Sequence, residues 1–208
     1  MDEQLRRSIE KLRRKREAAA LGGGQDRIRR QHGSGRLTAR ERIERLLDPD
    51  TFVEMNMLAS LPEDSKRDLF GDGVVVGYGK IDGRRVGVFS QDFTVNAGTT
   101  GPIHRGKITT IVDKAMKMGI PIIGLWDSTG GRLEQSNAPL PCARSSFFRR
   151  FTEASGVIPQ ISAILGPAAG NAGYGAALTD FIFIVDGIGH TFATGPLAVK
   201  EVMGEEIT

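Results

Sequence analysis

The sequence predicts an α/β domain in which helices pack outside a mostly parallel sheet. Two observations carry this prediction. From Gly73 onward, short runs rich in Val, Ile and aromatic residues alternate with helical patterns in the order strand-strand-helix, strand-helix, strand-helix, strand-strand-helix. In addition, most of the 27 glycines gather in short clusters at the ends of these predicted elements, which indicates many tight turns and close backbone approaches.

The first predicted element is a basic helix over residues 2–21. Leu5, Ile9 and Leu12 fall near one stripe of this segment, and Arg or Lys occupies much of the remainder. Three consecutive glycines then end the helix. A stripe of this kind is typical of a helix that lies on its own subunit or on a neighbouring one.

A second helix is predicted over residues 39–47. Before it, residues 31–35 are expected to form a loop. Thr38 is expected to be the N-cap, and Glu41, three residues later, completes a capping box. The helix stops before an Asp-Pro pair.

The part of the chain after residue 72 gives the sheet. Two apolar runs, 73–81 and 84–93, are separated by Asp82-Gly83, which is a strong signal for a two-residue hairpin. The remaining pattern predicts a helix closed by Gly119, strands over 120–126 and 157–165, a helix closed by Gly156, strands over 181–185 and 190–194, and a final helix that begins at Pro196.

Composition describes an ordinary globular chain with an uneven charge. Its 208 residues are 39% hydrophobic and 25% charged, which favours one domain with at most a small appendage. Residues 1–45 hold 14 Lys and Arg against 7 Asp and Glu, whereas the rest of the chain holds 14 against 18. A basic end on an acidic body indicates an anionic partner, which is a nucleic acid, a nucleotide-like cofactor or an acidic protein surface.

Cysteine content and hydropathy exclude several classes. The single cysteine, Cys142, excludes an internal disulfide framework and a four-cysteine zinc site, so the cytoplasm is the default compartment. No run approaches the ~18 consecutive apolar residues of a membrane-spanning helix. The first twenty residues are too charged for a signal peptide.

Two predicted strand-to-helix junctions, residues 126–132 and 165–174, share one character. Each has a strand, then glycine and other small residues, then a helix start. A helix N-terminus presents unpaired N–H groups, and two such junctions on adjacent parallel strands can aim two of them at one oxygen. That arrangement is an oxyanion hole. For either junction alone, a tight turn that needs glycine explains the pattern equally well. Neither is a phosphate loop, because no Lys-Ser/Thr pair follows the glycines.

Conventional catalytic groups are scarce. Ser128 lacks the G-x-S-x-G elbow of a nucleophilic serine. Asp127 is expected to cap its junction rather than act as a base, and Cys142 is expected to be a small core residue. The three histidines lie on unrelated elements and are expected to be packed or surface residues: His32, His104 and His190. This scarcity suits chemistry in which a cofactor supplies the proton acceptor and the protein stabilises an enolate.

Several strings of the sequence resemble the amino-terminal half of acyl-CoA carboxyltransferases. These are the β subunits of propionyl-CoA and related biotin-dependent carboxylases, and of the sodium-pumping methylmalonyl-CoA decarboxylases. The resemblance runs from Arg36 to Thr208. The strings that carry it are residues 35–43, 89–95, 155–162, 166–174, 177–180 and 194–196.

The resemblance implies a fold and a set of partners. The fold would be the crotonase-like (ClpP/crotonase) ββα spiral over residues 51–208, preceded by a basic helical extension over residues 1–50. We expect the chain to be one half of a larger unit that stops before a second domain. The implied partners are an acyl-CoA substrate, a biotin carboxyl carrier protein and a carboxyl-terminal carboxyltransferase domain or subunit, in a homo- or hetero-oligomer. No metal and no nucleic acid are implied.

The resemblance also implies a reaction. Carboxybiotin releases CO₂, the freed biotin nitrogen takes the α-proton of a short acyl-CoA, and the thioester enolate attacks CO₂. The active site would lie between this acyl-CoA-binding half of one subunit and the biotin-binding half of another. The protein would contribute orientation and enolate stabilisation.

Site residues follow from the family's two glycine loops. The loop D-S-G-G-A-R-I-Q-E-G falls on residues 127–136, where Asp127, Ser128, Gly130 and Arg132 match and Thr129, Gly131 and residues 134–136 depart. The Gly-Gly pair falls on Gly170 and Asn171, and asparagine retains the backbone N–H. The expected oxyanion donors are the amides of Gly130, Gly131, Gly170 and Asn171. The expected substrate-binding residues are Arg132, Ala169 and Lys107, the last beside a CoA phosphate.

Two other functions are compatible with the sequence. One is a non-catalytic scaffold or assembly subunit derived from a carboxyltransferase. The other is a nucleic-acid-binding arm at residues 1–45, against which stands the absence of any aromatic residue for base stacking in that segment.

Overall fold

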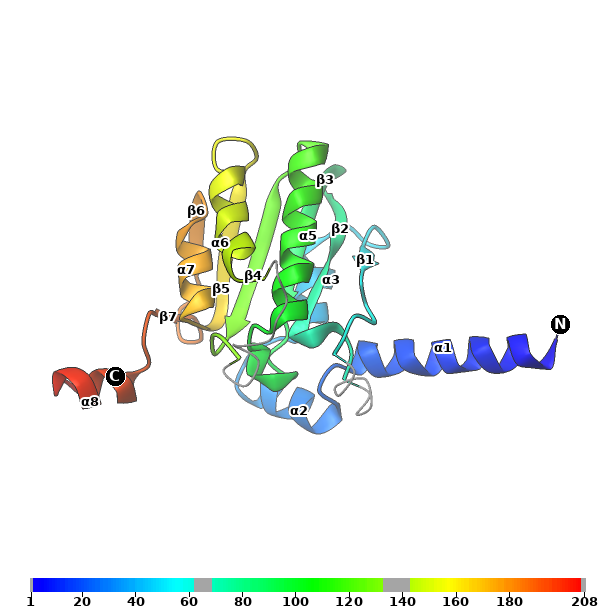
Figure 1. Ribbon diagram of the computed structural model, residues 1–208, viewed down its shortest axis with the longest axis horizontal. Helices are drawn as coiled ribbons and strands as arrows, with labels where there is room; N and C mark the ends of the chain where they lie inside the picture. Colours follow the sequence, from blue (N-terminus) through cyan, green and yellow to red (C-terminus); the bar gives the residue numbers. More distant parts are fainter. Residues whose placement is uncertain (1, 62–68, 133–142, 207–208) are drawn as a thin grey trace.

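A mixed seven-stranded sheet with helices on both faces forms the centre of the molecule. The computed structural model in Figure 1 describes residues 2–61, 69–132 and 143–206. Its strands are β1 (Val53–Met55), β2 (Val74–Ile81), β3 (Arg84–Gln91), β4 (Ile122–Ser128), β5 (Gln160–Ala169), β6 (Phe181–Ile184) and β7 (His190–Phe192). Its helices are α1 (Glu3–Leu21), α2 (Gln25–Gly33), α3 (Ala39–Leu46), α5 (Pro102–Met118), α6 (Ala143–Ala154), α7 (Asn171–Ala177) and α8 (Pro196–Met203), with 3₁₀ turns η1 (Gly71–Gly73) and η2 (Asn96–Gly98).

The strand order is β1-β2-β3-β4-β5-β6, and β7 pairs with the end of β5. The first three strands are antiparallel, whereas every pair from β3 onward is parallel. The predicted hairpin is confirmed, because Ile81 lies opposite Arg84 and the two turn residues, Asp82 and Gly83, both have positive φ. Two central residues of that kind match the twist of a tight hairpin.

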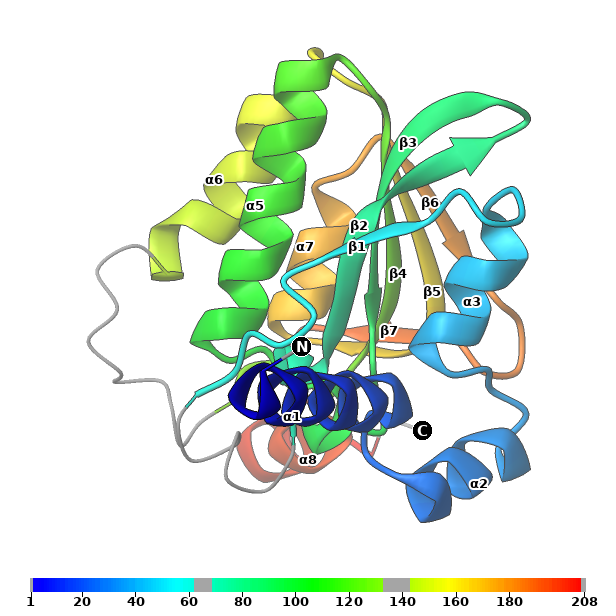
Figure 2. The same cartoon turned by 90° about the vertical axis from the view of Figure 1, so that its right-hand side faces the viewer.

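Helices α5, α6 and α7 cover one face of the sheet and α3 covers the other (Figure 2). The larger core lies under α5–α7, where Trp126 of β4 is fully buried and packs edge-to-face on Phe89 of β3, with ring centroids 4.9 Å apart. The Trp126 indole N–H donates to Ser162 Oγ at 2.8 Å, which satisfies its one buried polar atom.

The second core lies under α3. Ile43 and Leu47 pack there against Val88 and Leu125 of the sheet. The predicted capping box at the start of α3 is confirmed: the Thr38 side chain accepts from the Glu41 backbone N–H, and the Glu41 carboxylate accepts from the Thr38 N–H.

Two boundaries differ from the sequence prediction. Residues 31–35, expected as a loop, begin inside helix α2, which carries no apolar stripe and buries only Gln31. A periodic apolar signal therefore could not reveal it. Strand β5 starts after Pro159 and runs to Ala169, four residues past its expected end, so the junction that follows it is shorter than predicted.

The amino-terminal segment is tied to the sheet by a buried ion cluster, which we call the Asp127 cluster (Gln31, Arg36, Arg42 and Asp127). The Asp127 carboxylate at the end of β4 accepts from Arg42 at 2.6 Å, Arg36 at 2.9 Å and Gln31 at 3.0 Å. Asp127 is fully buried. It therefore anchors the extension. Asp127 was expected to cap the junction at residues 126–132, but its carboxylate accepts from Gln31, Arg36 and Arg42 instead, and these contacts also keep it from acting as a free base.

A second tie joins the segment after α1 to the segment after β3. The Gly23 N–H donates to Thr94 Oγ1 at 2.9 Å, and Arg27 donates to the Thr94 carbonyl at 3.1 Å. A Cβ at Gly23 would lie only 1.8 Å from the Thr94 carbonyl oxygen. Glycine is required at residue 23 for this close approach.

The edge of the sheet formed by β6 is apolar and uncovered. Residues 181–185, in and just after β6, are all large hydrophobic side chains with exposed fractions between 39% and 60%. Because consecutive residues of a strand point to opposite faces, both faces of β6 are open. None of the described helices is long and apolar enough to cross a membrane.

Replacing the central carboxylate of the Asp127 cluster should destabilise the protein strongly. Asp127→Ala leaves the buried Arg42 guanidinium and the partly buried Arg36 guanidinium without their anion, so we expect the free energy of unfolding in urea to fall by about 3 kcal/mol. Glu3→Ala, which breaks an exposed ion pair with Arg7, is the control and should leave the urea midpoint unchanged. A midpoint shared by Asp127→Ala and wild type would contradict the anchoring role.

The two glycines Gly23 and Gly33 provide a matched test of the second tie. Gly23→Ala forces the chain away from Thr94, so we expect a lower melting temperature and faster proteolysis between α1 and α2. Gly33→Ala meets nothing within 4 Å and lies in a helix, so it should be neutral or stabilising. Equal melting temperatures for the two variants would refute the close-approach argument.

Candidate active site

Two loops that follow neighbouring parallel strands form the candidate site. The first loop (residues 128–132) follows β4. Its Ser128 is buried, and the Ser128 hydroxyl accepts the Gly130 N–H at 3.1 Å. The Gly130 carbonyl accepts from the Thr100 N–H at 2.8 Å. Gly130 has φ of 105°, a conformation that favours glycine.

The second loop (residues 169–172) follows β5 and leads into α7. Its Gly170 has φ of 50° and donates its N–H to the Phe192 carbonyl of β7 at 3.0 Å. Asn171 is the first residue of α7, and no side chain caps that helix start. The first helical bond runs from the Tyr174 N–H to the Gly170 carbonyl, so the Asn171 N–H receives no partner from within the helix.

The structure brings the two loops into contact. A Cβ at Gly130 would lie 3.1 Å from the Ala169 carbonyl oxygen, and a Cβ at Gly131 would lie 3.1 Å from the Asn171 side-chain nitrogen. Ser128 is also in register with Ala168 across the β4–β5 pair. The expectation that the two junctions lie together is therefore met.

The four expected donors divide into two pairs. In this structure the Gly130 and Gly170 amides donate to Ser128 Oγ and the Phe192 carbonyl. The amides of Gly131 and Asn171 have no acceptor among the residues that the structure describes. Since the loops touch at these same two residues, Gly131 and Asn171 can supply one N–H group each to a shared oxygen.

Thr100, which the sequence did not single out, contacts both loops. It is 1% exposed, its hydroxyl donates to the Gly130 carbonyl at 3.2 Å, and its own carbonyl accepts the Arg132 N–H at 3.2 Å. The Asn171 side chain donates to Thr100 Oγ1 at 3.4 Å. A threonine within a run of small residues carries no sequence signal for this role.

Arg132 holds the first loop rather than facing a substrate. Its guanidinium donates to the Asp72 carboxylate at 2.5 Å, to Thr99 Oγ1 at 3.1 Å and to the Thr99 carbonyl at 2.9 Å. The side chain is 6% exposed. Asp72 and Thr99 are thus the partners of the guanidinium in this structure.

Lys107 and Ala169 also differ from expectation. Lys107 is 2% exposed, and its ammonium donates to the Gly71 and Val74 carbonyls. Burial lowers its pKa to about 8. Ala169, the first residue of the second loop, is 8% exposed and packs against Gly130 of the first loop.

A buried polar chain lies behind the first loop and includes His104 of α5. The His104 Nδ1–H donates to the Asp72 carbonyl at 2.9 Å, and His104 Nε2 accepts from the Gln91 amide at 3.2 Å. The Gln91 side-chain carbonyl accepts the Asp127 N–H at 3.1 Å. Complete burial lowers the pKa of His104 to about 3, so the imidazole is neutral and packed, in keeping with the sequence expectation.

The comparisons with known proteins decide the family. A model of the carboxyl transferase domain matches residues 30–208. The chain belongs to the carboxyl transferase family. It is 50% identical over 206 residues to the carboxyltransferase subunit of propionyl-CoA carboxylase from Haloferax mediterranei, covering 96% of this chain and 39% of that protein. It is 48% identical over 206 residues to methylmalonyl-CoA decarboxylase subunit alpha from Propionigenium modestum, covering 97% and 40%.

A solved structure agrees with this assignment. The chain matches transcarboxylase 12S, a hexamer solved with methylmalonyl-coenzyme A and methylmalonic acid bound, with a TM-score of 0.90 and 38% identity over all of this chain and 41% of that one. The chain therefore spans about two fifths of the length of these relatives. In the decarboxylase, the similar subunit is named alpha rather than beta.

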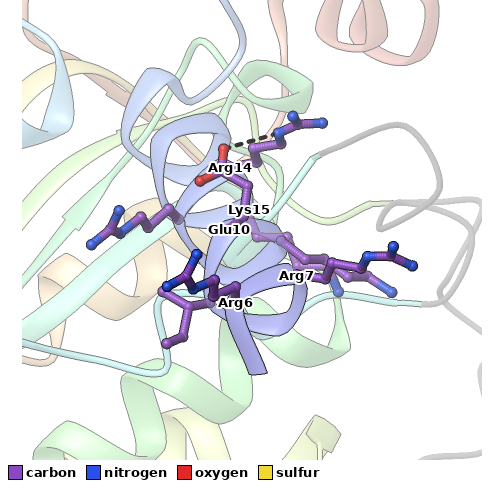
Figure 3. A pocket seen from close by; sticks show the side chains of 8 residues that line it. Arg6, Arg7, Glu10, Arg14 and Lys15 are labelled. Carbon is purple, nitrogen blue, oxygen red and sulfur yellow. Dashed lines mark hydrogen bonds and ion pairs between the residues drawn. The ribbon is translucent and has the colours of Figure 1, made fainter. Parts of the chain in front are cut away.

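Other features lie away from the two loops of this carboxyl transferase domain. A hollow on the surface of α1 is lined by residues of that helix, and Figure 3 shows Arg6, Arg7 and Lys15 projecting there while Arg14 pairs with Glu10. Within residues 2–61, 69–132 and 143–206, no three metal-ligating side chains gather. Cys142 and residues 133–136, which the sequence analysis considered, lie outside the described residues.

The buried His104 should make stability depend on pH. Its pKa is about 3 in the folded chain against an ordinary value of 6.5, so between these values the unfolded chain binds a proton that the folded chain does not. The contribution of the neutral His104 to the free energy of unfolding is therefore complete above pH 6.5. As pH falls from 6.5 toward 3, the free energy of unfolding decreases by about 1.4 kcal/mol per pH unit.

Urea unfolding of wild type and His104→Gln between pH 7 and 4 measures this effect. The difference in unfolding free energy between the two proteins should shrink as pH falls, because glutamine does not titrate. His190→Gln, at an exposed position, should follow wild type throughout. If the difference in unfolding free energy between wild type and His104→Gln stays constant with pH, the imidazole of His104 is not buried in its neutral form.

Proposed function

We propose that this chain is the acyl-CoA-binding half of a biotin-dependent carboxyltransferase. The observation that supports the proposal most directly is the contact between two loops at neighbouring strand ends, where the Gly131 and Asn171 amides have no acceptor among the described residues. Relatives that act on propionyl-CoA and methylmalonyl-CoA support a short acyl-CoA as the substrate. We also propose that the domain is a crotonase-like ββα spiral, in line with its β2-β3-α5 unit and the later strand–helix units.

The proposed role of the two amides is to carry the negative charge of a thioester enolate. Removal of the α-proton moves charge onto the thioester oxygen, and two fixed N–H groups stabilise that charge more than they stabilise the neutral carbonyl. The donors are neutral and sit on loops held by hydrogen bonds, so little reorganisation is needed as the charge develops. No described side chain at the loops is placed to act as an acid or base.

The transferable carboxyl group and the proton acceptor are proposed to come from carboxybiotin, which supplies both when it is bound. Because no group in this chain is assigned to biotin, we propose that a biotin carboxyl carrier protein and a second carboxyltransferase half complete the site in an oligomer. The half-buried Gly131 and Asn171 amides fit the thioester side of such a reaction. Carboxyl transfer is reversible, so we propose that the other parts of that complex determine whether the reaction runs as carboxylation or as decarboxylation.

Removing one amide donor should test the proposal. Asn171 is the first residue of α7, where proline is tolerated, so Asn171→Pro deletes the N–H with little cost to the helix. In this chain reconstituted with the remaining part of a propionyl-CoA carboxyltransferase and its biotin carrier, we expect kcat to fall by about 10²–10³-fold. Asn171→Ala, which keeps the N–H and loses only the side chain, should lower kcat by no more than about tenfold, so the excess loss in Asn171→Pro reports the N–H itself.

Calorimetry separates the enzyme from a scaffold. The wild-type chain should give saturable heat with propionyl-CoA or methylmalonyl-CoA, and Asn171→Pro should bind either ester with similar affinity, because the lost donor acts chiefly in the transition state. Absence of saturable heat, together with absence of turnover in every reconstitution, would favour a non-catalytic assembly subunit.

A further inference from the structure

A short chain of hydrogen bonds crosses from the second loop to the first. It begins at the Asn171 carboxamide, which donates to Thr100 Oγ1 at 3.4 Å. The Thr100 hydroxyl in turn donates to the Gly130 carbonyl at 3.2 Å. A hydroxyl has one donor and two acceptor positions, so threonine can fill both roles at once. Hydrogen bonds in series also polarise and strengthen one another.

The Asn171 side chain also packs closely against the first loop. A Cβ added at Gly131 would lie 3.1 Å from the Asn171 side-chain nitrogen. Gly131 is not among the residues with positive φ, so glycine is present here for space rather than for backbone conformation. The carboxamide therefore lies at the contact between the two loops, beside the two amides for which the described part of the chain provides no acceptor.

Thr100 is itself firmly held. It is 1% exposed, its N–H donates to the Gly130 carbonyl at 2.8 Å, and its carbonyl accepts the Arg132 N–H at 3.2 Å. It follows η2, where Asn96, Ala97 and Gly98 all have positive φ. Non-glycine residues in that conformation persist only where surrounding contacts fix them. The hydroxyl thus projects from a fixed backbone.

We infer that the Thr100 and Asn171 side chains form a bridge that sets the separation of the Gly131 and Asn171 amides. Both are positioning residues, because the inferred role acts through the two amides and not on the substrate. The inference rests on the proposed function, since the separation matters only if both amides meet one oxygen. Donor groups are effective when they are held within about 0.5 Å of the productive geometry.

Turnover measurements in the reconstituted enzyme test the bridge through kcat. Thr100→Val is nearly isosteric but can neither accept from Asn171 nor donate to Gly130. We expect it to lower kcat about tenfold with little change in KM, because a misplaced donor weakens the transition state selectively. Thr100→Ser keeps the hydroxyl and should restore kcat. Thr152→Val, an exposed threonine in α6, is the matched control and should match wild type.

The double variant distinguishes a bridge from two separate structural effects. Asn171→Ala alone should also lower kcat about tenfold, and Thr100→Val with Asn171→Ala should be no slower than either single variant, because both break the same connection. Effects that multiply in the double variant, or a kcat for Thr100→Val equal to wild type, would overturn the bridge.

A spectroscopic measurement on the chain itself keeps the outcome independent of turnover. In ¹H–¹⁵N spectra, Asn171→Ala should move the Gly131 amide resonance on the other loop, and Thr100→Val should move the Gly131 and Asn171 resonances, whereas Thr152→Val should move neither. Unmoved resonances would overturn the bridge even in an active enzyme. An inactive wild-type enzyme with the expected shifts would instead overturn the proposed function and leave the bridge standing.

Discussion

The placement of the candidate site depends on one buried ion cluster. Asp127 is the penultimate residue of β4 and directly precedes the first loop, and its carboxylate accepts hydrogen bonds from Arg36, Arg42 and Gln31 of the amino-terminal segment. Burial raises the pKa of Asp127, and the two guanidinium groups oppose that rise. Breaking such a cluster is far more costly than its net contribution to stability suggests, so its main effect is to specify one arrangement.

The same aspartate sets local backbone geometry. A Cβ at Gly98 would lie 2.2 Å from the Asp127 carbonyl oxygen, and a Cβ at Gly166 would lie 2.1 Å from its carboxylate. Three segments that are distant in sequence therefore converge on this residue: the extension, the η2 turn before Thr100, and β5. Residues 1–45 hold half of the Lys and Arg residues of the chain, and this excess suggested an external anionic partner. Two of these residues, Arg36 and Arg42, form ion pairs with Asp127 of the same chain instead.

Local rules predicted most elements, because their signals are local. The Asp82-Gly83 hairpin, the capping box at Thr38 and the helix start at Pro196 each depend on a few adjacent residues. Helix α2 could not be predicted from periodicity, because Ile28 is its single apolar side chain larger than glycine and no stripe forms; a tertiary hydrogen bond at Gln31 ties it to the sheet.

The site was predicted only in outline. Glycine-rich strand ends located the two loops, but which amides remain unpaired depends on partners far away in sequence. Gly170 loses its N–H to Phe192, more than twenty residues later, and Lys107 is buried by a turn some thirty residues earlier. Spacing along the chain does not reveal such contacts, so the sequence could not predict the intramolecular partners of Gly130, Gly170, Lys107 and Arg132.

The open β6 edge has a consequence for handling the protein. A strand with free N–H and C=O groups and hydrophobic side chains on both faces is a template for pairing with any similar strand. Within β6 itself, Phe181–Ile184, no charged residue or proline interrupts the edge. At high concentration this surface favours edge-to-edge association, and the charged residues of α1 at the far end of the molecule do nothing to screen it.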